Sequence, residues 1–565
     1  MQLNCTKTAF LLLTLCYSIT SIAQVDTDIE STQQDIIEDF IQNTGEESDF
    51  DFITLTENLR YAAEHPVNLN KATYEELLDL TLLSDLQINS LIDYRQKVGD
   101  LINIYELQAV PNWDVPTIKK ILPFVAVSGD FKDFNVPIAR MMSQGKNDLF
   151  LRFRRQLEEQ KGYTLPPDIG YLGDRNQYFM RYRHTYENRL SWGFTAEKDP
   201  GEEFFKGSNK FGFDFYSAHF FLKDYNSWLK ALAIGDYAVN MGQGLILYSG
   251  FASGKNAFVT KIRRGGRTLR PFTSVNEFIF NRGAAATINI SKKIELTAFA
   301  SFLKKDGNVQ ISSDTLNDNF DDFSVSSLLI SGLHRTQNEI ADKHQLLQTT
   351  FGAVVKYKLQ RGHVAFNILN DRFSRSLIRN PEVYNQYYFS GNNLFNASID
   401  YNYIFQNFNF FGEIASSDNA GVAVVNGLLV GLSRQGNSAV DLAIHHRYLG
   451  VKYQALLPNP FAETGQGSNE HGLYVGLEIK PNINWQLSTY FDIWKHPWLR
   501  YNADAPSHGN EFFSRLTYNI KRQLEIYFQY RIENKQINTP ESFEKIDYLS
   551  NTQRQQLRLN VINKV

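Results

Sequence analysis

A two-residue alternation of apolar and polar side chains is the feature that most constrains this chain. It is clearest over residues 473–480 and 524–531, and it also runs through 149–154 and 180–187. Because successive side chains of a strand point to opposite faces, each stretch predicts a strand with one apolar face. A membrane helix needs about 20 consecutive apolar residues. The best candidate after the leader, residues 422–432, is too short and contains an asparagine and glycines. The pattern therefore predicts a sheet protein and excludes a helical membrane protein.

Composition indicates what surrounds these strands. Aromatic residues make up 14% of the chain although only 43% of it is hydrophobic, which fits strands that face lipid on one side and water on the other. Candidate strands recur about every 12 to 20 residues, and short turns alternate with long loops, as in outer-membrane barrels. We therefore predict a mainly β fold, a large antiparallel transmembrane β-barrel of about 18 strands over residues 145–565. A soluble β-propeller or β-helix would need a fixed-period repeat, which the sequence lacks. Short turns are expected at 291–293, 360–362, 481–482 and 521–522.

Residues 1–23 predict a secretory signal peptide. Lys7 precedes an apolar run, and Ser21-Ile22-Ala23 supplies the small residues of a cleavage site. A lipoprotein leader is the alternative at Cys16, but a leucine stands before it where a small residue would be expected. Cys5 and Cys16 are the two cysteines of the chain, and both fall in this leader. The mature chain is therefore expected to lack disulfides, thiolate metal sites and cysteine nucleophiles.

The net charge changes sign along the chain. Residues 25–127 carry 20 acidic and 6 basic side chains, a net charge of -14, whereas residues 128–565 carry +9. Such an asymmetry indicates two parts with different surroundings. Helical spacing of apolar residues predicts an acidic helical segment over residues 24–64 and a helical domain over 65–127. Residues 128–144 would link this domain to the barrel.

The predicted helical domain contains a recognisable series of motifs. They are Val67-Asn68-Leu69-Asn70-Lys71-Ala72-Thr73, Glu75-Glu76-Leu77, Leu91-Ile92, Tyr94-Arg95, Gly99, Glu106-Leu107 and Pro123-Phe124-Val125. This series resembles the tandem helix-hairpin-helix domain of competence-type DNA receptors. In that family each hairpin turn carries a Gly-hydrophobic-Gly element whose backbone N–H groups approach a DNA phosphate. The resemblance implies a small all-α domain of two hairpins and suggests DNA binding as one function.

The hairpin turns of this chain depart from that family. The turns hold Leu82-Leu83-Ser84 and Asn112-Trp113-Asp114, so all four expected glycines are absent. Asp114 would place a carboxylate near the phosphate, and non-specific DNA affinity comes from cations, which an acidic domain lacks. Nucleic acid is therefore a disfavoured partner. We expect these six turn residues to be available for contacts with protein, and packing in the core is the alternative for their apolar members.

Further motifs lie in the predicted barrel. They are Gly235-Asp236-Tyr237, Gly242-Gln243-Gly244-Leu245, Arg270-Pro271-Phe272-Thr273-Ser274, Arg282-Gly283-Ala284-Ala285, Gly332-Leu333-His334-Arg335-Thr336 and Pro497-Trp498-Leu499-Arg500-Tyr501. With the helical domain they resemble a Gram-negative family that joins a periplasmic helix-hairpin-helix domain to a large barrel. The resemblance covers nearly the whole mature chain. It implies an outer-membrane location with the N-terminal domain in the periplasm, and it implies no established activity.

A long basic loop is the strongest candidate for a binding site. Residues 251–282 carry seven basic side chains against a single acid, Glu277. Folded into the lumen, such a loop would form a positive constriction that attracts anionic solutes. The alternative is that these side chains pair with acidic residues of other strands or with anionic lipid groups. The candidate lumen anion-binding residues are Lys255, Lys261, Arg263, Arg264, Arg267 and Arg270.

No catalytic or metal-binding set is evident. Residues 242–244 form Gly-Gln-Gly, which lacks the lysine of a P-loop and the βαβ context of a dinucleotide site. His445 and His446 point to opposite faces of their strand, so they cannot both ligate one metal there. Asp441 and His445 share a face, but no serine is spaced to complete a triad. We therefore predict no enzyme activity, no metal and no cofactor.

These observations predict a non-enzymatic outer-membrane barrel that acts in envelope transport or assembly. Its periplasmic helical domain would dock a partner or occlude the pore. Expected partners are outer-membrane lipid and a periplasmic or outer-membrane protein. The alternative is a DNA-uptake protein that uses the helical domain as its receptor. Residues 557–565 lack the final aromatic that outer-membrane barrels commonly carry, so we expect either an atypical closure or further strands.

Overall fold

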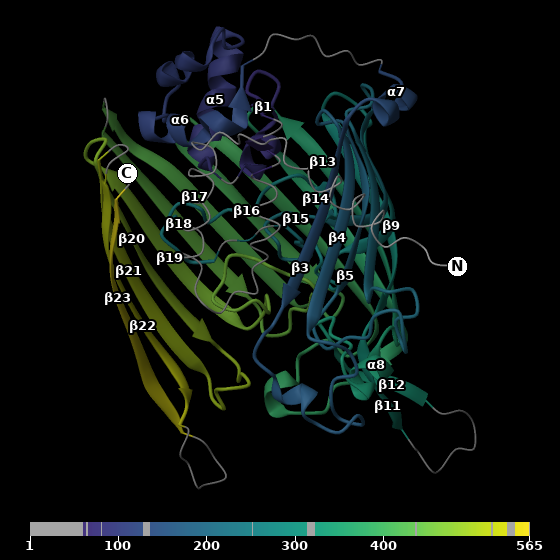
Figure 1. The fold of residues 1–565 in the computed structure, drawn as a ribbon. Coiled ribbons are helices and arrows are strands. Elements are labelled where there is room, and N and C mark those ends of the chain that lie inside the picture. Colours follow the sequence, from purple (N-terminus) through teal and green to yellow (C-terminus); the bar gives the residue numbers. More distant parts are fainter. Residues whose placement is uncertain are drawn as a thin grey trace.

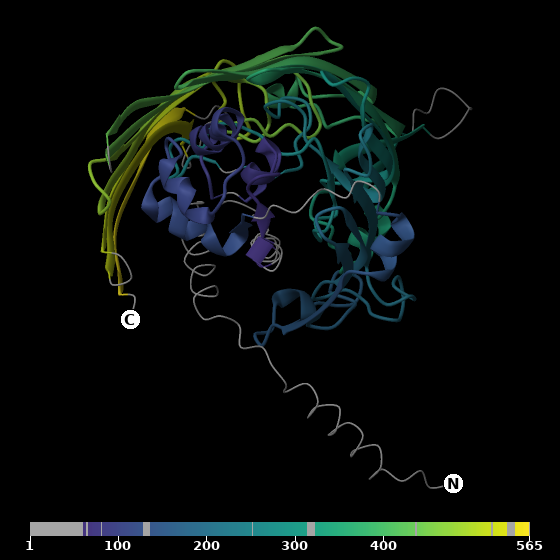
Figure 2. The ribbon, with the colours of Figure 1, turned by 90° about the horizontal axis from the view of Figure 1, so that it is seen from above.

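A ring of strands surrounds a small group of helices at one of its rims (Figure 1, Figure 2). The computed structural model describes residues 60, 62–63, 66–80, 82–127, 136–250, 252, 254–312, 322–435, 438–520, 524–539 and 548–563. The predicted signal peptide, nearly all of the acidic segment 24–64 and residues 128–135 of the predicted linker lie outside this part.

The helical part consists of two short helical hairpins, and a two-stranded sheet pairs its beginning with its end. β1 (Val67–Asn68) pairs in parallel with β2 (Val125–Ala126). Leu69, Leu77, Leu91 and Phe124 are among the fully buried residues of its own apolar core. The helices are α4 (Tyr74–Asp79), α5 (Asp85–Val98), η1 (Ile104–Ala109), α6 (Val115–Ile121) and η2 (Leu122–Phe124), where η marks a 3₁₀ helix.

Side-chain caps explain where the α-helices of this part begin. The Thr73 hydroxyl accepts a hydrogen bond from the backbone N–H of Glu76, and Glu76 accepts one in return from the backbone N–H of Thr73. Ser84 forms the same capping box at the start of α5. Asp114 caps α6 by accepting the backbone N–H of Thr117 at 2.7 Å. Each cap satisfies N–H groups that have no partner within the helix.

Within the described residues, twenty-one strands make up the large sheet, in the order of a closed barrel. They are β3 (Lys146–Arg155), β4 (Asn176–Tyr186), β5 (Leu190–Lys198), β6 (Phe215–Lys223), β7 (Leu229–Val239), β8 (Leu269–Pro271), β9 (Asn281–Asn289), β10 (Ile294–Lys305), β11 (Gly307–Ser312), β12 (Asp322–Leu328), β13 (Leu346–Leu359), β14 (Gly362–Leu377), β15 (Gly391–Phe405), β16 (Phe408–Ser417), β17 (Val422–Gln435), β18 (Ser438–Leu449), β19 (Glu470–Lys480), β20 (Trp485–His496), β21 (Ser507–Ile520), β22 (Leu524–Asn538) and β23 (Leu549–Asn563). Short helices outside the sheet are α7 (Ile138–Ser143), η3 (Lys161–Tyr163), α8 (Gln337–Asp342) and η4 (Val383–Asn385), so the predicted linker contains a helical turn, α7.

The wall of the barrel is an antiparallel meander. β7 pairs directly with β9 and β10 pairs directly with β13, so β8 and the β11–β12 hairpin are additions to the wall. The remaining eighteen strands of the described chain agree with the predicted number. An even number is the rule for antiparallel barrels made from one chain.

Neighbouring wall strands are joined by paired residues all the way from β3 to β23. The strand order makes β3 and β23 neighbours at the seam of the ring, but no paired residues join these two strands in the part of the chain that the structure describes. Outward apolar residues at this seam are strongly exposed, for example Leu151 at 67% and Leu559 at 65%.

Turn lengths distinguish the two ends of the barrel. Short turns, including 187–189, 360–361 and 481–484, lie at the end that holds the helical part. The turns that the sequence predicted at 291–293, 360–362 and 481–482 are confirmed at this end. The predicted turn at 521–522 falls in the gap between β21 and β22, outside the described residues. Long loops, such as 156–175, 199–214 and 329–345, lie at the opposite end with α8 and the β11–β12 hairpin (Figure 1). No helix in the part of the chain that the structure describes is both long and apolar enough to cross a membrane.

Candidate functional site

The connection between β7 and β9, residues 240–280, folds into the lumen. Ala257, Val259 and Ile262 of this loop pack against aromatic side chains on the inner face of the opposite wall, among them Phe411 and Tyr490. The part that carries the basic residues therefore crosses the inside of the barrel, and Lys255 pairs there with acidic residues of other strands, which the sequence offered as the alternative to an anion-binding constriction. We call residues 240–280 the lumen loop.

The start of the lumen loop is fixed by a carboxylate of the wall. The backbone N–H groups of Gln243 and Leu245 donate to one oxygen of Glu413 on β16, at 2.7 and 3.1 Å. Gly242 and Gly244 adopt φ angles of 50° and 83°, which glycine tolerates best. Successive N–H groups in such a turn form a concave anion-binding nest. The Gly-Gln-Gly motif thus binds a carboxyl group of the chain itself.

The middle of the lumen loop is fixed by a buried lysine. The Lys255 ammonium lies 2.5 Å from Glu463, 3.0 Å from Asp492 and 2.8 Å from Glu511. Burial alone would lower the pKa of Lys255, but these three carboxylates raise it. The ammonium also lies 4.2 Å from the ring centre of Trp494. This lysine therefore holds the loop against the far wall as a permanent cation.

Arg264 makes a second fixed point in the lumen loop. Its guanidinium donates to the backbone carbonyls of Asn459 at 2.8 Å and Pro460 at 3.0 Å. Burial lowers the pKa of Arg264 to about 10, so the group stays charged at neutral pH. The loop is therefore tied to another long loop, residues 450–469, inside the lumen.

Glu76 of α4 is the first contact between the helical part and the barrel. Its Oε1 accepts from Arg267 of the lumen loop and from Asn188 of the β4–β5 turn, both at 3.1 Å, and it forms an ion pair with Lys223 of β6. Its Oε2 closes the capping box at Thr73. One carboxylate thus caps a helix and binds three groups of the barrel.

Asp85, at the start of α5, makes the second contact. Its carboxylate forms an ion pair with Arg263 at 2.7 Å, and both side chains are about 95% buried. The hydroxyl of Tyr74 lies between them as a hydrogen-bond partner of each, and the Arg263 guanidinium lies 4.8 Å from the ring centre of Tyr74. Water is largely excluded from this pair, so its attraction is screened less than that of a surface pair.

Asp114, at the tip of the second hairpin, makes the third contact. Its carboxylate lies 3.3 Å from the Lys480 ammonium at the end of β19. Burial would raise the pKa of Asp114, but the charge of Lys480 and the backbone N–H of Thr117 together lower it. The carboxylate therefore stays ionised at neutral pH.

A close backbone approach completes the docking of the helical part. A Cβ added at Gly265 of the lumen loop would overlap the Leu78 side chain of α4. Phe258 of the same loop packs against the core of the helical part. A side chain at position 265 would therefore force Leu78 to move.

A small cavity of about 40 Å³ remains between α4, the lumen loop and the wall. Glu75, Arg263, Lys356, His363, Asn367 and Asp400 are among its lining residues. Burial would raise the pKa of Glu75, but the charges of Lys356 and His363 contribute to lowering it. A space of this size accommodates a few water molecules. Glu75 is thus a fourth carboxylate of the helical part that faces a cation of the barrel.

The six predicted loop cations therefore have different surroundings. Lys255 and Arg264 anchor the loop, whereas Arg263 and Arg267 bind the helical part. Lys261 lies 4.5 Å from the ring centre of Phe258, and Arg270 lies in β8. Anion binding by these residues stays a prediction.

The six predicted hairpin-turn residues divide in a similar way. Asp114 contacts the barrel, whereas Ser84 caps α5 and Leu83 is buried in the domain core, against which Leu82 also packs. The indole N–H of Trp113 donates to the Gln87 carbonyl at 2.8 Å, and Asn112 binds Ser90. The sequence did not identify Glu76 and Asp85 as residues that contact the barrel. The Thr73-x-x-Glu76 capping box and the opposite charges of the two parts were the available signals.

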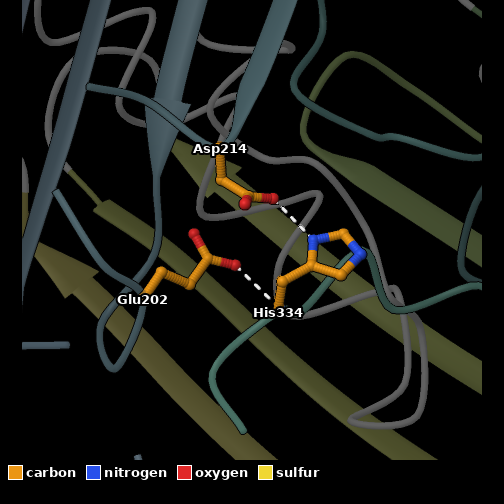
Figure 3. Close-up of side chains that lie close together, drawn as sticks. All are labelled: Glu202, Asp214 and His334. Carbon is orange, nitrogen blue, oxygen red and sulfur yellow. Dashed lines mark hydrogen bonds and ion pairs between the residues drawn. The ribbon is translucent and has the colours of Figure 1, made fainter. Parts of the chain in front are cut away.

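A second polar cluster lies among the long loops, at the end opposite the helical part. His334 donates from Nδ1 to Asp214 at 2.6 Å and from Nε2 to Asp306 at 2.9 Å, while its backbone N–H donates to Glu202 at 2.9 Å. Figure 3 shows the Asp214 carboxylate directed at the ring and Glu202 directed at the backbone. Burial would lower the pKa of His334, but the two carboxylates raise it to about 10.

Glu202, Asp214 and His334 offer one ligand atom each within 4.8 Å, a grouping that could hold a metal ion. The chemistry of the donor set argues against this use, because both ring nitrogens of His334 donate to carboxylates. A protonated imidazole is a cation and offers no lone pair to a metal. The cluster instead joins the β5–β6 loop to the β10–β13 loop. His334 belongs to the Gly332–Thr336 motif, and no local pattern in the sequence indicates Asp214 and Asp306 as its partners, because they lie 120 and 28 residues away.

Comparison with family models finds no match, and comparison with curated proteins finds none. The helix-hairpin-helix resemblance therefore stays a prediction. Among solved structures, this chain is similar to Escherichia coli Wzi, which is described as an outer-membrane protein involved in group 1 capsule assembly and as a carbohydrate-binding β-barrel. The two are 10% identical with a TM-score of 0.33, and the similarity covers 75% of this chain and 86% of Wzi. Pseudomonas aeruginosa OccK2 (OpdF) is 10% identical with a TM-score of 0.31, over 74% and 96%. Acinetobacter baumannii OccAB3 is 13% identical with a TM-score of 0.32, over 74% and 100%.

Proposed function

We propose that this protein is a non-enzymatic outer-membrane channel that is closed by its own N-terminal helical domain. The channel acts in transport across the Gram-negative envelope, and the helical domain, which we call the plug, lies at the periplasmic mouth. The single observation that carries the proposal is the set of ion pairs that joins Glu76, Asp85 and Asp114 of the plug to cations of the lumen.

The distribution of side chains across the wall supports a membrane location. On β20, Phe491 and Ile493 point outward and are 47% and 42% exposed, whereas Asp492 between them is completely buried in the lumen. β15 has the same order, with Ile399 outside and Ser398 and Asp400 inside. A soluble barrel buries its apolar face, whereas a membrane barrel presents that face to lipid and keeps a polar lumen.

The arrangement of the two ends supports the orientation. The plug, the start of β3 and the end of β23 all lie at the short-turn end (Figure 1). In bacterial outer-membrane barrels the short turns are periplasmic and the long loops extracellular. The plug therefore faces the periplasm, where a partner protein could reach it.

The plug function is tested by conductance in planar bilayers. The wild-type channel is expected to be mostly closed. The triple variant Glu76→Gln, Asp85→Asn, Asp114→Asn is expected to conduct, because it loses the negative charges that hold the plug. Each amide is close in size to the carboxylate that it replaces and still fits. Gln at position 76 also preserves the capping box. The control is Asp93→Asn, which removes one carboxylate from an exposed pair with Lys97 on the plug. Equal conductance of the wild type and the triple variant would disprove the proposal that the plug closes the channel.

The position of the plug also bears on the DNA-binding alternative. Ser84 and Asp114 cap the two helix starts at which DNA-binding hairpins of the similar family would receive phosphate, and Asp114 faces Lys480 of the barrel. An acidic carboxylate at that position repels phosphate. DNA uptake is thus the weaker proposal on physical grounds.

A further inference from the structure

We propose that the plug is a pseudosubstrate, and that the lumen cations which hold it form the binding site for an acidic polypeptide segment. This inference rests on the proposed function, because the site becomes free only when the plug leaves. The relevant cations are Lys223, Arg263, Arg267, Lys356 and Lys480.

These cations come from four separate parts of the barrel wall and interior. Lys223 ends β6, Arg263 and Arg267 belong to the lumen loop, Lys356 lies on β13 and Lys480 ends β19. The plug covers them with Glu75, Glu76, Asp85 and Asp114. If the plug moved out, Arg263 and Arg267 would lose the carboxylates of Asp85 and Glu76, whereas Lys223 and Lys480 would keep Asp224 and Glu478 of the barrel as neighbours. Buried cations that lose a counter-charge in a confined lumen attract anions strongly.

The best-formed pocket of the barrel is occupied by a carboxylate. Lys223, Arg267 and Asn188 converge on a single oxygen of Glu76, and the other oxygen turns back to the Thr73 backbone. The Thr73 N–H belongs to the plug and would leave with it, so the barrel itself supplies the three donors that meet the first oxygen. The occupant seen in the pocket is a side chain of a polypeptide, and this favours an acidic polypeptide over a polysaccharide.

The plug is tied to the barrel by its own chain, which restricts the type of competitor. An intramolecular group acts at an effective concentration of the order of millimolar, so a single free carboxylate cannot displace it efficiently. A competitor must occupy several of the pockets at once. The ligand is therefore a chain with several carboxylates, and free glutamate at the same carboxylate concentration serves as the monovalent comparison.

The test measures binding of fluorescent poly-L-glutamate to the full chain in detergent, by anisotropy. The triple variant Glu76→Gln, Asp85→Asn, Asp114→Asn is expected to bind at least about 10-fold more tightly than wild type, because its cations are no longer neutralised. Adding Arg263→Ser and Arg267→Ser to that variant should remove most of the gain. Lys97→Ser, on the exposed face of the plug, is the matched control and should leave binding unchanged.

Each other outcome has a defined meaning. Equal affinity of wild type and triple variant, or binding that survives the loss of Arg263 and Arg267, would overturn the pseudosubstrate inference. Tighter binding of polygalacturonate or polyphosphate than of poly-L-glutamate would overturn the choice of polypeptide. Because anisotropy does not depend on conduction, a triple variant that conducts but binds no poly-L-glutamate would sink this inference and leave the channel proposal intact. The melting temperature of each variant checks that it is folded.

Discussion

Glu76 illustrates how much one side chain can do at the residue scale. It closes the capping box of α4 and holds Lys223 and Arg267 at the same time. The capping role was predictable, because Thr73-x-x-Glu76 is a local motif. The docking role was not predictable from sequence, since Arg267 is 191 residues away and nothing local identifies it as the partner. The Asp85–Arg263 pair, 178 residues apart, was hidden for the same reason.

Gly265 gives the first prediction at this scale. Gly265→Phe is expected to push Leu78 and α4 away from the lumen loop and to increase channel opening in planar bilayers, because a Cβ at this position already overlaps Leu78 and a phenyl ring is much larger. Gly254→Phe is the matched control, since a Cβ at position 254 meets nothing within 4 Å. If both variants opened to the same degree, the contact at Gly265 would have no part in closure.

At the scale of elements, the strands were predictable and the loops were not. Alternation over 473–480 and 524–531 is a local property, and β19 and β22 are found there. The lumen loop showed its charge in the sequence, but its path depends on contacts with distant elements. Glu413 on β16 receives the turn at 242–245, and Glu463, Asp492 and Glu511 receive Lys255. A sequence pattern does not specify such distant pairs.

The stability that His334 gives to the loop cluster around it is expected to depend on pH. The folded pKa of His334, about 10, lies above its unfolded value of about 6.5, so its stabilisation is fully present below pH 6.5 and is lost as the pH rises through 10. His334→Gln removes a buried cation that pairs with two carboxylates, and we expect this to cost about 3 kcal/mol at pH 6. Melting temperatures of wild type and variant, measured from pH 6 to pH 11, should differ most at the acid end and converge above pH 10. A constant difference would show that the imidazolium charge is not the cause.

At the scale of the whole molecule, opposite charges divide between plug and barrel. The net charge of -14 on residues 25–127 and +9 on residues 128–565 predicted two parts with different surroundings. The structure joins these parts through complementary pairs inside one ring of strands (Figure 2). The sequence predicted that the helical part either docks a partner or occludes the pore. Composition alone could not distinguish these two, because it does not show which charges meet.

Channel conductance is expected to depend on the salt concentration, because charge joins the two parts of the molecule. The Debye length falls from about 10 Å at 0.1 M to about 3 Å at 1 M, so the contacts of Lys480 and Arg267, whose side chains are 24% and 22% exposed, should weaken as KCl is raised. Single-channel conductance, divided by the conductivity of the solution, should therefore rise between 0.1 and 1 M KCl for wild type. The triple variant, which lacks these ion pairs, should show no such rise. A flat wild-type curve would mean that charge does not hold the plug.

The order of contacts along the chain has a consequence for biogenesis. The plug precedes the first wall strand, yet its partners lie on β6, on the lumen loop and at the end of β19, late in the chain. Its resting place therefore does not exist until most of the cylinder has been built. Seating the plug must be a final step of assembly, and a newly inserted barrel would pass through a short, unsealed stage before that step.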